Sequence, residues 1–105
     1  MQPDQEQLDD LVQRIRRVIE PQRVVLFGSA ARGEMSPDSD LDVLVIVCNG
    51  ADVKTITGRI YRGLIGFSAA VDVIVATEDD ILQLGDNPSL VYYPALREGR
   101  QIYAA

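Results

Sequence analysis

Two aspartates separated by one residue stand at the head of an apolar segment, and this spacing is suited to binding a divalent cation. Asp40 directly precedes the segment 41–47 and Asp42 is its second residue, and the apolar, β-branched composition of this segment predicts a strand. Residues two apart on a strand project from the same face, about 6–7 Å apart at Cβ, so both carboxylates reach into one space. Two charges that share a site favour a cation, and carboxylate oxygens suit Mg²⁺. The alternative is a solvated strand end, where aspartate is common.

Asp72 is a third acid in an apolar setting, because it interrupts the run 69–75. A buried carboxylate without a partner is costly, so a functional role would explain its position. If its strand lies beside the strand that carries Asp40 and Asp42, the three carboxylates face one another and complete a two-metal site, with ions ~4 Å apart. The alternative is the exposed face of an edge strand.

The segment 28–33, Gly-Ser-Ala-Ala-Arg-Gly, follows the short apolar strand predicted at 24–27. Small residues at such a turn let backbone N–H groups approach an anion, and a following helical turn directs its positive end to the same place. Ser29 offers a hydroxyl donor, while Arg32 either contacts phosphate or braces the loop through a carboxylate. Taken alone, the segment also fits an ordinary strand-to-helix turn.

Together these residues predict transfer of a nucleotidyl group. Asp40 and Asp42 would hold the ions on an incoming triphosphate, and Asp72 would bind the ion beside the acceptor and help to deprotonate its hydroxyl. In-line attack at the α-phosphorus would then release pyrophosphate, with most of the acceleration coming from positioning and charge stabilisation.

The elements that position these residues follow from periodicity and from helix start and stop signals. We expect α/β (α+β) architecture with a small sheet flanked by helices, and one domain over residues 1–105. Beyond the strands at 24–27, 41–47 and 71–75, the sequence predicts helices at 4–20, 53–64 and 77–84, a helix starting at Asn87-Pro88 and ending at Gly99, and an edge strand at 100–103.

The composition bounds the class of protein. With 47% apolar and 25% charged residues, the 105-residue chain is expected to be globular, and a net charge of −6 disfavours binding to bulk nucleic acid. The absence of a long apolar run and of a basic N-terminus predicts no membrane span and a cytoplasmic location. Cys48, the single cysteine, excludes an internal disulfide and is expected to be buried.

Several other side chains are expected to have structural roles. The arginines at 14, 16 and 17 are interpreted as solvated surface, and Asp79-Asp80 as the acids of a helix start. Core packing is the expected role of the larger apolar and aromatic side chains, with a partner surface as the alternative. These residues are Tyr61, Phe67, Leu90, Tyr92, Tyr93 and Tyr103.

The run 28–33 followed by Ser39-Asp40-Leu41-Asp42 resembles the signature of the nucleotidyltransferase superfamily that includes DNA polymerase beta, kanamycin nucleotidyltransferase and CCA-adding enzymes. It is most similar to the stand-alone minimal nucleotidyltransferases, the MNT or MntA-like proteins. Asp72 matches the expected later acid, and the resemblance extends over most of the chain. It implies a mixed, mainly parallel sheet, catalytic and metal-binding roles for Asp40, Asp42 and Asp72, and two Mg²⁺ ions.

The resemblance also implies that Gly28, Ser29 and Ser39 contact the triphosphate of ATP, with Arg32 as a further nucleotide-binding residue. Larger members carry a helical domain that grips the acceptor, and we expect this chain to rely on something else for that role. Minimal members are similar to the antitoxin of HEPN/MNT toxin–antitoxin pairs, in which AMP is added to a tyrosine of a helical HEPN toxin. That similarity implies a HEPN toxin partner and AMPylation.

Two other functions remain open from the sequence. A binding antitoxin would inhibit its partner by contact and use nucleotide only for structure, although clustered acids are not needed for steric inhibition. A transferase for a small molecule, such as an aminoglycoside, would need a pocket that this chain alone does not provide, and a homodimer would be one way to build it.

Overall fold

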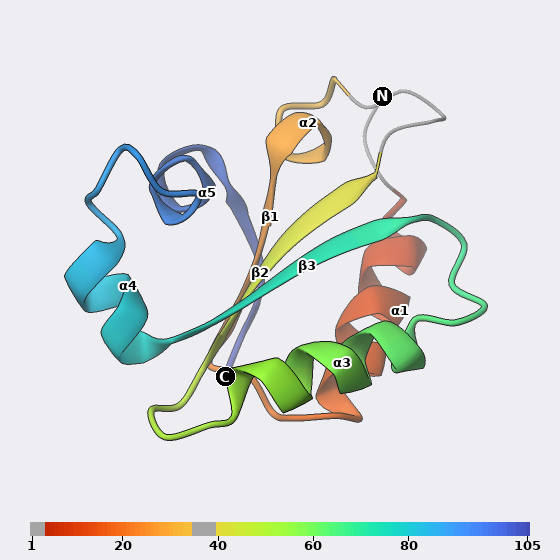
Figure 1. The fold of residues 1–105 in the computed structure, drawn as a ribbon. Coiled ribbons are helices and arrows are strands. Elements are labelled where there is room, and N and C mark those ends of the chain that lie inside the picture. Colours follow the sequence, from red (N-terminus) through yellow and green to blue (C-terminus); the bar gives the residue numbers. More distant parts are fainter. Residues whose placement is uncertain (1–3, 35–39) are drawn as a thin grey trace.

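The chain folds into a four-stranded sheet with helices against both faces, as Figure 1 shows for this computed structural model, which describes residues 4–34 and 40–105. Its elements in chain order are α1 (Gln5–Arg16), β1 (Arg23–Phe27), α2 (Gly28–Ala31), β2 (Leu41–Val47), α3 (Val53–Gly63), β3 (Val71–Thr77), α4 (Glu78–Leu84), α5 (Tyr92–Glu98) and β4 (Arg100–Ala104). The predicted α/β class with a small mixed sheet is confirmed.

The strands lie in the order β3-β2-β1-β4. β1 pairs antiparallel with β2 and with β4, and only the β2–β3 pairing is parallel. The expectation of a mainly parallel sheet is therefore wrong. A parallel pair needs a crossover connection, usually a helix, and α3 supplies one between β2 and β3, whereas antiparallel neighbours such as β1 and β2 need none.

The alternation of side chains along β2 decides which residues face which helices. Odd-numbered residues join the larger core cluster with α1 and α3, whereas Leu44 and Ile46 join the second cluster with α4 and α5. β2 is buried along nearly its whole length, as expected for a strand covered on both faces. Asp42, two residues before Leu44, consequently lies on the α4–α5 side of the sheet.

Most helix boundaries match the predicted signals. The hydroxyl of Thr77 accepts a hydrogen bond from the Asp80 N–H, and the Asp80 carboxylate accepts one from the Thr77 N–H, so this pair forms the capping box at the start of α4. α1 is shorter than the predicted 4–20, since it ends at Arg16 and a turn leads to Pro21.

The predicted helix start at Asn87-Pro88 is wrong, because α5 begins only at Tyr92. The side chain of Asn87 accepts a hydrogen bond from the Ser89 N–H at 3.0 Å, and its carbonyl accepts one from Leu90, so these residues form turns. Pro94 occupies the first turn of α5, where its missing N–H is tolerated, and Gly99 follows as the C-terminal cap, as predicted.

Cys48 is exposed, so the expectation of a buried cysteine is wrong. β2 ends at Val47, and Cys48 opens the turn in which its carbonyl accepts a hydrogen bond from Ala51. Among the described residues, no helix combines the length and apolar character needed to cross a bilayer.

Arg14 has a structural role that the sequence did not suggest. Its guanidinium donates to the carbonyls of Gly63 and Ile65 at 3.0 and 3.1 Å, and it lies over the Phe67 ring. It thereby joins α1 to the C-terminal end of α3, where a cation is favourable. The interpretation of Arg14 as solvated surface is therefore wrong.

The aromatic side chains divide between core and surface. Phe67 and Tyr103 pack against the larger core cluster and Tyr92 against the second, as expected. Tyr61, by contrast, is 43% exposed at the end of α3.

Candidate active site

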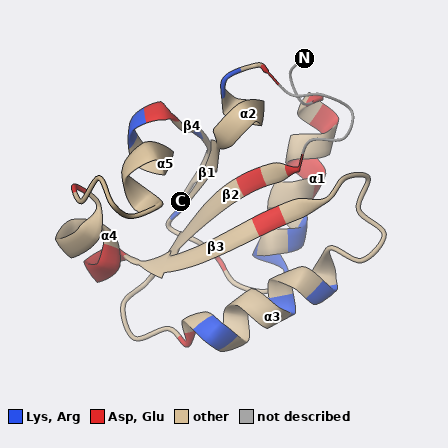
Figure 2. Cartoon of the chain, turned by 45° about the horizontal axis from the view of Figure 1, so that its top comes forward, with Lys and Arg blue, Asp and Glu red and all other residues tan. Residues whose placement is uncertain are grey.

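Asp42 and Asp72 are direct neighbours across the β2–β3 ladder. The parallel register pairs Asp42 with Asp72, and Figure 2 shows the two acidic positions side by side on adjacent strands. Paired residues of neighbouring strands project from the same face. Ile74 and Ala76, which follow Asp72 at intervals of two, belong to the second core cluster, so both aspartates face the α4–α5 side.

The surroundings of Asp42 disfavour its ionised form. Partial burial raises the pKa of the Asp42 carboxyl, and the charges of Asp72 and Asp40 together with a hydrogen bond to the Asp72 side chain raise it further. The positive charge of Arg32 acts in the opposite direction but is the weakest of these influences. The site therefore holds more negative charge than its own residues neutralise, which favours an added cation.

The structure combines two interpretations of Asp72 that the sequence had left as alternatives. Asp72 is exposed and lies on an edge strand, yet its position places it beside Asp42 rather than away from it. Asp40 is also exposed and directly precedes β2. Within residues 4–34 and 40–105, no three acidic, cysteine or histidine side chains converge as a metal-holding group. The three-carboxylate site stays a prediction, and its core is the pair Asp42–Asp72.

Gly28 brings the backbone of the strand-to-helix turn against Asp42. Phe27, the last residue of β1, is the register partner of Asp42, and Gly28 begins α2 with a φ of 71°. A Cβ atom at this position would overlap the Asp42 carboxylate, and the positive φ is a conformation that other residues rarely adopt. Glycine is thus required for two independent reasons at the place where the sequence predicted a phosphate-binding turn.

The other predicted nucleotide-binding residues lie on or near this turn. Ser29 is half-buried within α2, and its carbonyl accepts a hydrogen bond from the Glu34 N–H at 2.9 Å. Ser39 lies outside the described residues. Arg32 is the C-terminal cap of α2 and is close enough to Asp42 for its charge to act on that carboxyl.

Two carboxylates that the sequence analysis missed hold Arg32. Its Nε donates to Glu34 at 3.0 Å, and its Nη1 lies 3.7 Å from a carboxylate oxygen of Glu98 on α5. These ion pairs are contacts of the bracing kind, which was one of the two predicted alternatives for Arg32, and its contact with phosphate stays a prediction. The position of Glu34, two residues along the same turn, was a usable signal, but the contact with Glu98 depends on the packing of α5 near α2.

An α/β domain that sets paired carboxylates against a glycine turn at one end of a mixed sheet has the groups that proteins use to handle metal-bound phosphates. A comparison of sequences makes the assignment specific. The nucleotidyltransferase domain family matches residues 6–100, and the chain belongs to this family. The family predicted from the motif at 28–42 is confirmed.

The curated relatives include aminoglycoside (3'') (9) adenylyltransferases of Klebsiella pneumoniae and Escherichia coli. Each is 35% identical to this chain over an alignment of 103 positions, which covers 88% of this chain and 36% of the relative. The chain therefore spans little more than a third of the length of these relatives.

Solved structures with the same fold include toxin–antitoxin complexes. A chain of a toxin–antitoxin complex with AMP-PNP superposes with a TM-score of 0.69 at 18% identity, over 93% of this chain and 73% of that one. A chain of the complex between tri-AMPylated HEPN toxin of Shewanella oneidensis and MNT antitoxin gives a TM-score of 0.64 at 16% identity, over 97% and 74% of the two chains.

Proposed function

We propose that this domain transfers AMP from MgATP to a hydroxyl of a protein partner, a tyrosine of a HEPN toxin, and so acts as the antitoxin of the pair. The observation that carries the proposal is the register pairing of Asp42 with Asp72 beside the Gly28 turn. Membership of the nucleotidyltransferase domain family supports the reaction class. The likeness in fold to a chain from the HEPN–MNT complex motivates the choice of partner.

The carboxylates suit a divalent cation. Asp42 and Asp72 are hard oxygen donors on adjacent strands, and the pKa of Asp42 is raised first by burial and then by the negative charges of Asp72 and Asp40, which a cation would offset. We infer that Asp40, Asp42 and Asp72 hold Mg²⁺. When bound, Mg²⁺ neutralises charge on the triphosphate and on the departing pyrophosphate.

The residues of the turn are proposed to orient the triphosphate. The absence of a side chain at Gly28 lets the backbone of the turn lie directly against the Asp42 carboxylate, and Ser29 and Ser39 would supply hydroxyl donors to a phosphate there. Arg32 adds a positive charge near the same place, since its charge acts on the Asp42 carboxyl.

Asp72 is the proposed proton acceptor, because it is more exposed than Asp42 and so accessible to an acceptor from outside. The acceptor hydroxyl oxygen forms a bond to the α-phosphorus while the bond from that phosphorus to the bridging oxygen of the β-phosphate breaks. Pyrophosphate leaves with that electron pair, and the hydroxyl proton passes to the Asp72 carboxylate and then to solvent.

A small-molecule acceptor is the second candidate, favoured by the 35% identity to aminoglycoside adenylyltransferases. A single experiment separates the two functions. ATP labelled at the α-phosphate is incubated with Mg²⁺ and the chain, together with either a co-encoded HEPN protein or an aminoglycoside, and the labelled product is identified.

We expect label on a tyrosine of the HEPN protein, with Asp42→Asn and Asp72→Asn each reducing the rate by about 10²–10⁴-fold. Asp79→Asn is the matched control, since this exposed acid lies in the first turn of α4 and is expected to leave the rate unchanged. Label on the aminoglycoside alone would favour the second candidate. Inhibition of the toxin without label, unaffected by Asp42→Asn, would favour an antitoxin that acts by contact.

A further inference from the structure

The strand that carries Asp72 has an unpaired edge. β3 is the outermost strand on its side of the sheet, so no strand among the described residues pairs with its outer edge. The Leu41 N–H donates to the Ala70 carbonyl at 2.9 Å, which fixes even-numbered residues of β3 as those bonded to β2. The backbone groups of Val71, Val73 and Val75 therefore point outward.

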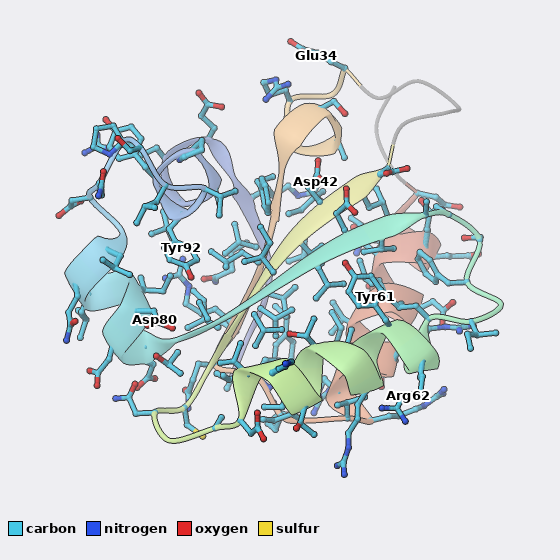
Figure 3. All side chains as sticks on the ribbon, in the orientation of Figure 1. Glu34, Asp42, Tyr61, Arg62, Asp80 and Tyr92 are labelled. Carbon is cyan, nitrogen blue, oxygen red and sulfur yellow. The ribbon has the colours of Figure 1, made fainter. Side chains whose placement is uncertain are left out.

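Tyr61 covers part of this edge. Its hydroxyl accepts a hydrogen bond from the Val73 N–H at 2.9 Å, and Figure 3 shows the Tyr61 side chain extending from α3 toward β3. The ring is 43% exposed, so the bond is made by a single surface side chain rather than by a packed element. At the far end of the strand, the Thr77 N–H is bonded to Asp80 within the α4 cap. The outward N–H of Thr77 is therefore occupied by the α4 cap, whereas the outward N–H of Val73 is bonded only to the Tyr61 hydroxyl, which another strand could displace.

A segment added to this edge would bring its side chains to the carboxylates. Residues that lie opposite one another on adjacent strands have Cβ atoms about 4.5–5.5 Å apart on the same face. A residue that follows the edge beside Asp72 would therefore project to the face on which Asp42 and Asp72 lie. The edge is accordingly placed to deliver a hydroxyl side chain to the site.

The helix that flanks the edge carries basic side chains although the chain as a whole carries −6. α3 contains Lys54, Arg59 and Arg62 and no acidic residue, and Figure 2 shows the basic positions along it. Lys54 lies seven residues before Tyr61, so both side chains leave the helix on nearly the same side, whereas Arg62, the next residue, leaves it about 100° away. None of these three cations forms an ion pair within the described residues.

We propose that the β3 edge docks an extended, acidic segment of the acceptor protein, which pairs with β3 through its backbone and presents its hydroxyl residue to Asp72. Such strand addition takes affinity from main-chain hydrogen bonds. The positive flank of α3 selects acidic side chains in that segment. This inference rests on the proposed transfer of AMP to a protein hydroxyl and specifies how the acceptor is recognised.

The probe is a synthetic peptide with a central tyrosine and alternating valine and glutamate residues. We expect the chain to bind it, as measured by fluorescence anisotropy, and to label its tyrosine from α-labelled ATP. A copy with N-methyl groups on alternate backbone amides, which cannot pair with a strand, is expected to bind at least tenfold more weakly, as is a copy with lysine in place of glutamate. Lys54→Glu combined with Arg62→Glu should weaken binding of the glutamate peptide tenfold and favour the lysine copy.

Tyr61→Phe provides a test with the opposite sign. Removing the hydroxyl frees the Val73 N–H, so peptide binding should strengthen by a few-fold while the rest of α3 is unchanged. The docking proposal would be overturned if the glutamate peptide failed to bind. It would also be overturned if the N-methylated peptide bound equally well, or if binding did not depend on the charges of α3. An edge-to-edge dimer of this chain that Lys54→Glu and Arg62→Glu disrupt would overturn it as well.

The docking and the chemistry fail separately. Asp72→Asn is expected to bind the peptide but not to label it. Binding without label in the wild-type chain would therefore support docking at the β3 edge and contradict the proposed transfer of AMP. If a HEPN partner is labelled but neither the α3 charges nor N-methylation has an effect, the transfer of AMP is supported and docking at the β3 edge is contradicted.

Discussion

Asp42 and Asp72 are register partners in the parallel β2–β3 ladder, and both face the side of the sheet that α4 and α5 cover. Each partner is the second residue of its strand, so both lie at the end of the sheet where β2 and β3 begin. The end of β1 and the Gly28 turn lie at this same end. One pairing register thus assembles acids from positions thirty residues apart in the sequence, and a slip of a single residue would place them on opposite faces.

Asp42→Asn is expected to raise the free energy of unfolding at neutral pH. The Asp42 carboxyl loses its proton near pH 3.8 in the unfolded chain and at a higher pH in the folded chain. The free energy of unfolding therefore falls as the pH rises from 3.8 through the raised pKa of the folded state. The amide variant lacks this loss and should unfold a few degrees higher at neutral pH, with the difference vanishing below 3.8. Thermal unfolding as a function of pH measures the effect. Asp79→Asn serves as the control, and an equal rise in that variant would contradict the assignment.

Mg²⁺ is expected to stabilise the folded chain. A ligand that binds only the folded state adds about 2.7 kcal/mol at a hundred times its dissociation constant. Thermal unfolding in increasing MgCl₂, compared with NaCl at matched ionic strength, should show a rise that Asp42→Asn and Asp72→Asn greatly reduce. A rise of the same size in both variants would place the ion elsewhere.

Arg32→Gln should shift the pH dependence of transfer. The Arg32 charge lowers the pKa of Asp42, so its removal should raise that pKa and move the acid limb of kcat/KM to higher pH. We also expect the KM for ATP to rise about tenfold, the effect of losing roughly 1.4 kcal/mol of phosphate binding. Arg97→Gln is the matched control, since Arg97 lies over the Tyr93 ring on the same helix as Glu98. An unchanged acid limb in Arg32→Gln would rule out this influence.

Gly28→Ala and Gly50→Ala form a matched pair. Both glycines have positive φ, 71° and 85°, so each substitution is expected to cost about 1–2 kcal/mol in backbone strain. At Gly50 a Cβ would meet nothing within 4 Å, whereas at Gly28 it would displace the Asp42 carboxylate. Denaturant unfolding should therefore show a larger loss for Gly28→Ala, and only this variant should lose transfer, by about a hundredfold. Equal activity in the two variants would show that the Asp42 position is not critical.

Gly99→Ala tests the close packing that sets α5 against the sheet. A Cβ at Gly99 would lie 2.5 Å from Val25 Cγ1 and 3.0 Å from the Leu26 carbonyl, and it would also overlap the Ala95 carbonyl. Overpacking of this kind costs typically 1–3 kcal/mol, and we expect a loss in that range by urea unfolding. Gly58 lies inside α3, and a Cβ there would come no closer than 3.7 Å to a neighbouring side chain, that of Arg62. Gly58→Ala is therefore expected to raise the free energy of unfolding by up to about 1 kcal/mol. If Gly99→Ala leaves the free energy of unfolding unchanged, α5 moves to accommodate the added methyl group without cost.

Much of the secondary structure could be predicted because it depends on local patterns. Leu41–Val47 has the predicted bounds, since an apolar β-branched run identifies a strand covered on both faces. The Thr77 cap is equally local, because the hydroxyl and the carboxylate that form it are three residues apart. The failures arose where another constraint decided the local geometry, as at Asn87, where a turn replaces the predicted helix start, and at Cys48, which lies just past the end of the buried strand and opens an exposed turn.

The sequence by itself determined the chemical groups of the site and their nearest spacings. These are the glycine turn, the two acids one residue apart, and a further acid in an apolar run. Only the tertiary structure decided that Asp72 pairs with Asp42, that Glu98 holds Arg32, and that the β3 edge is covered by Tyr61. The physical reason is that strand pairing and helix packing join residues far apart in the chain, and their register depends on which faces are buried rather than on any local pattern.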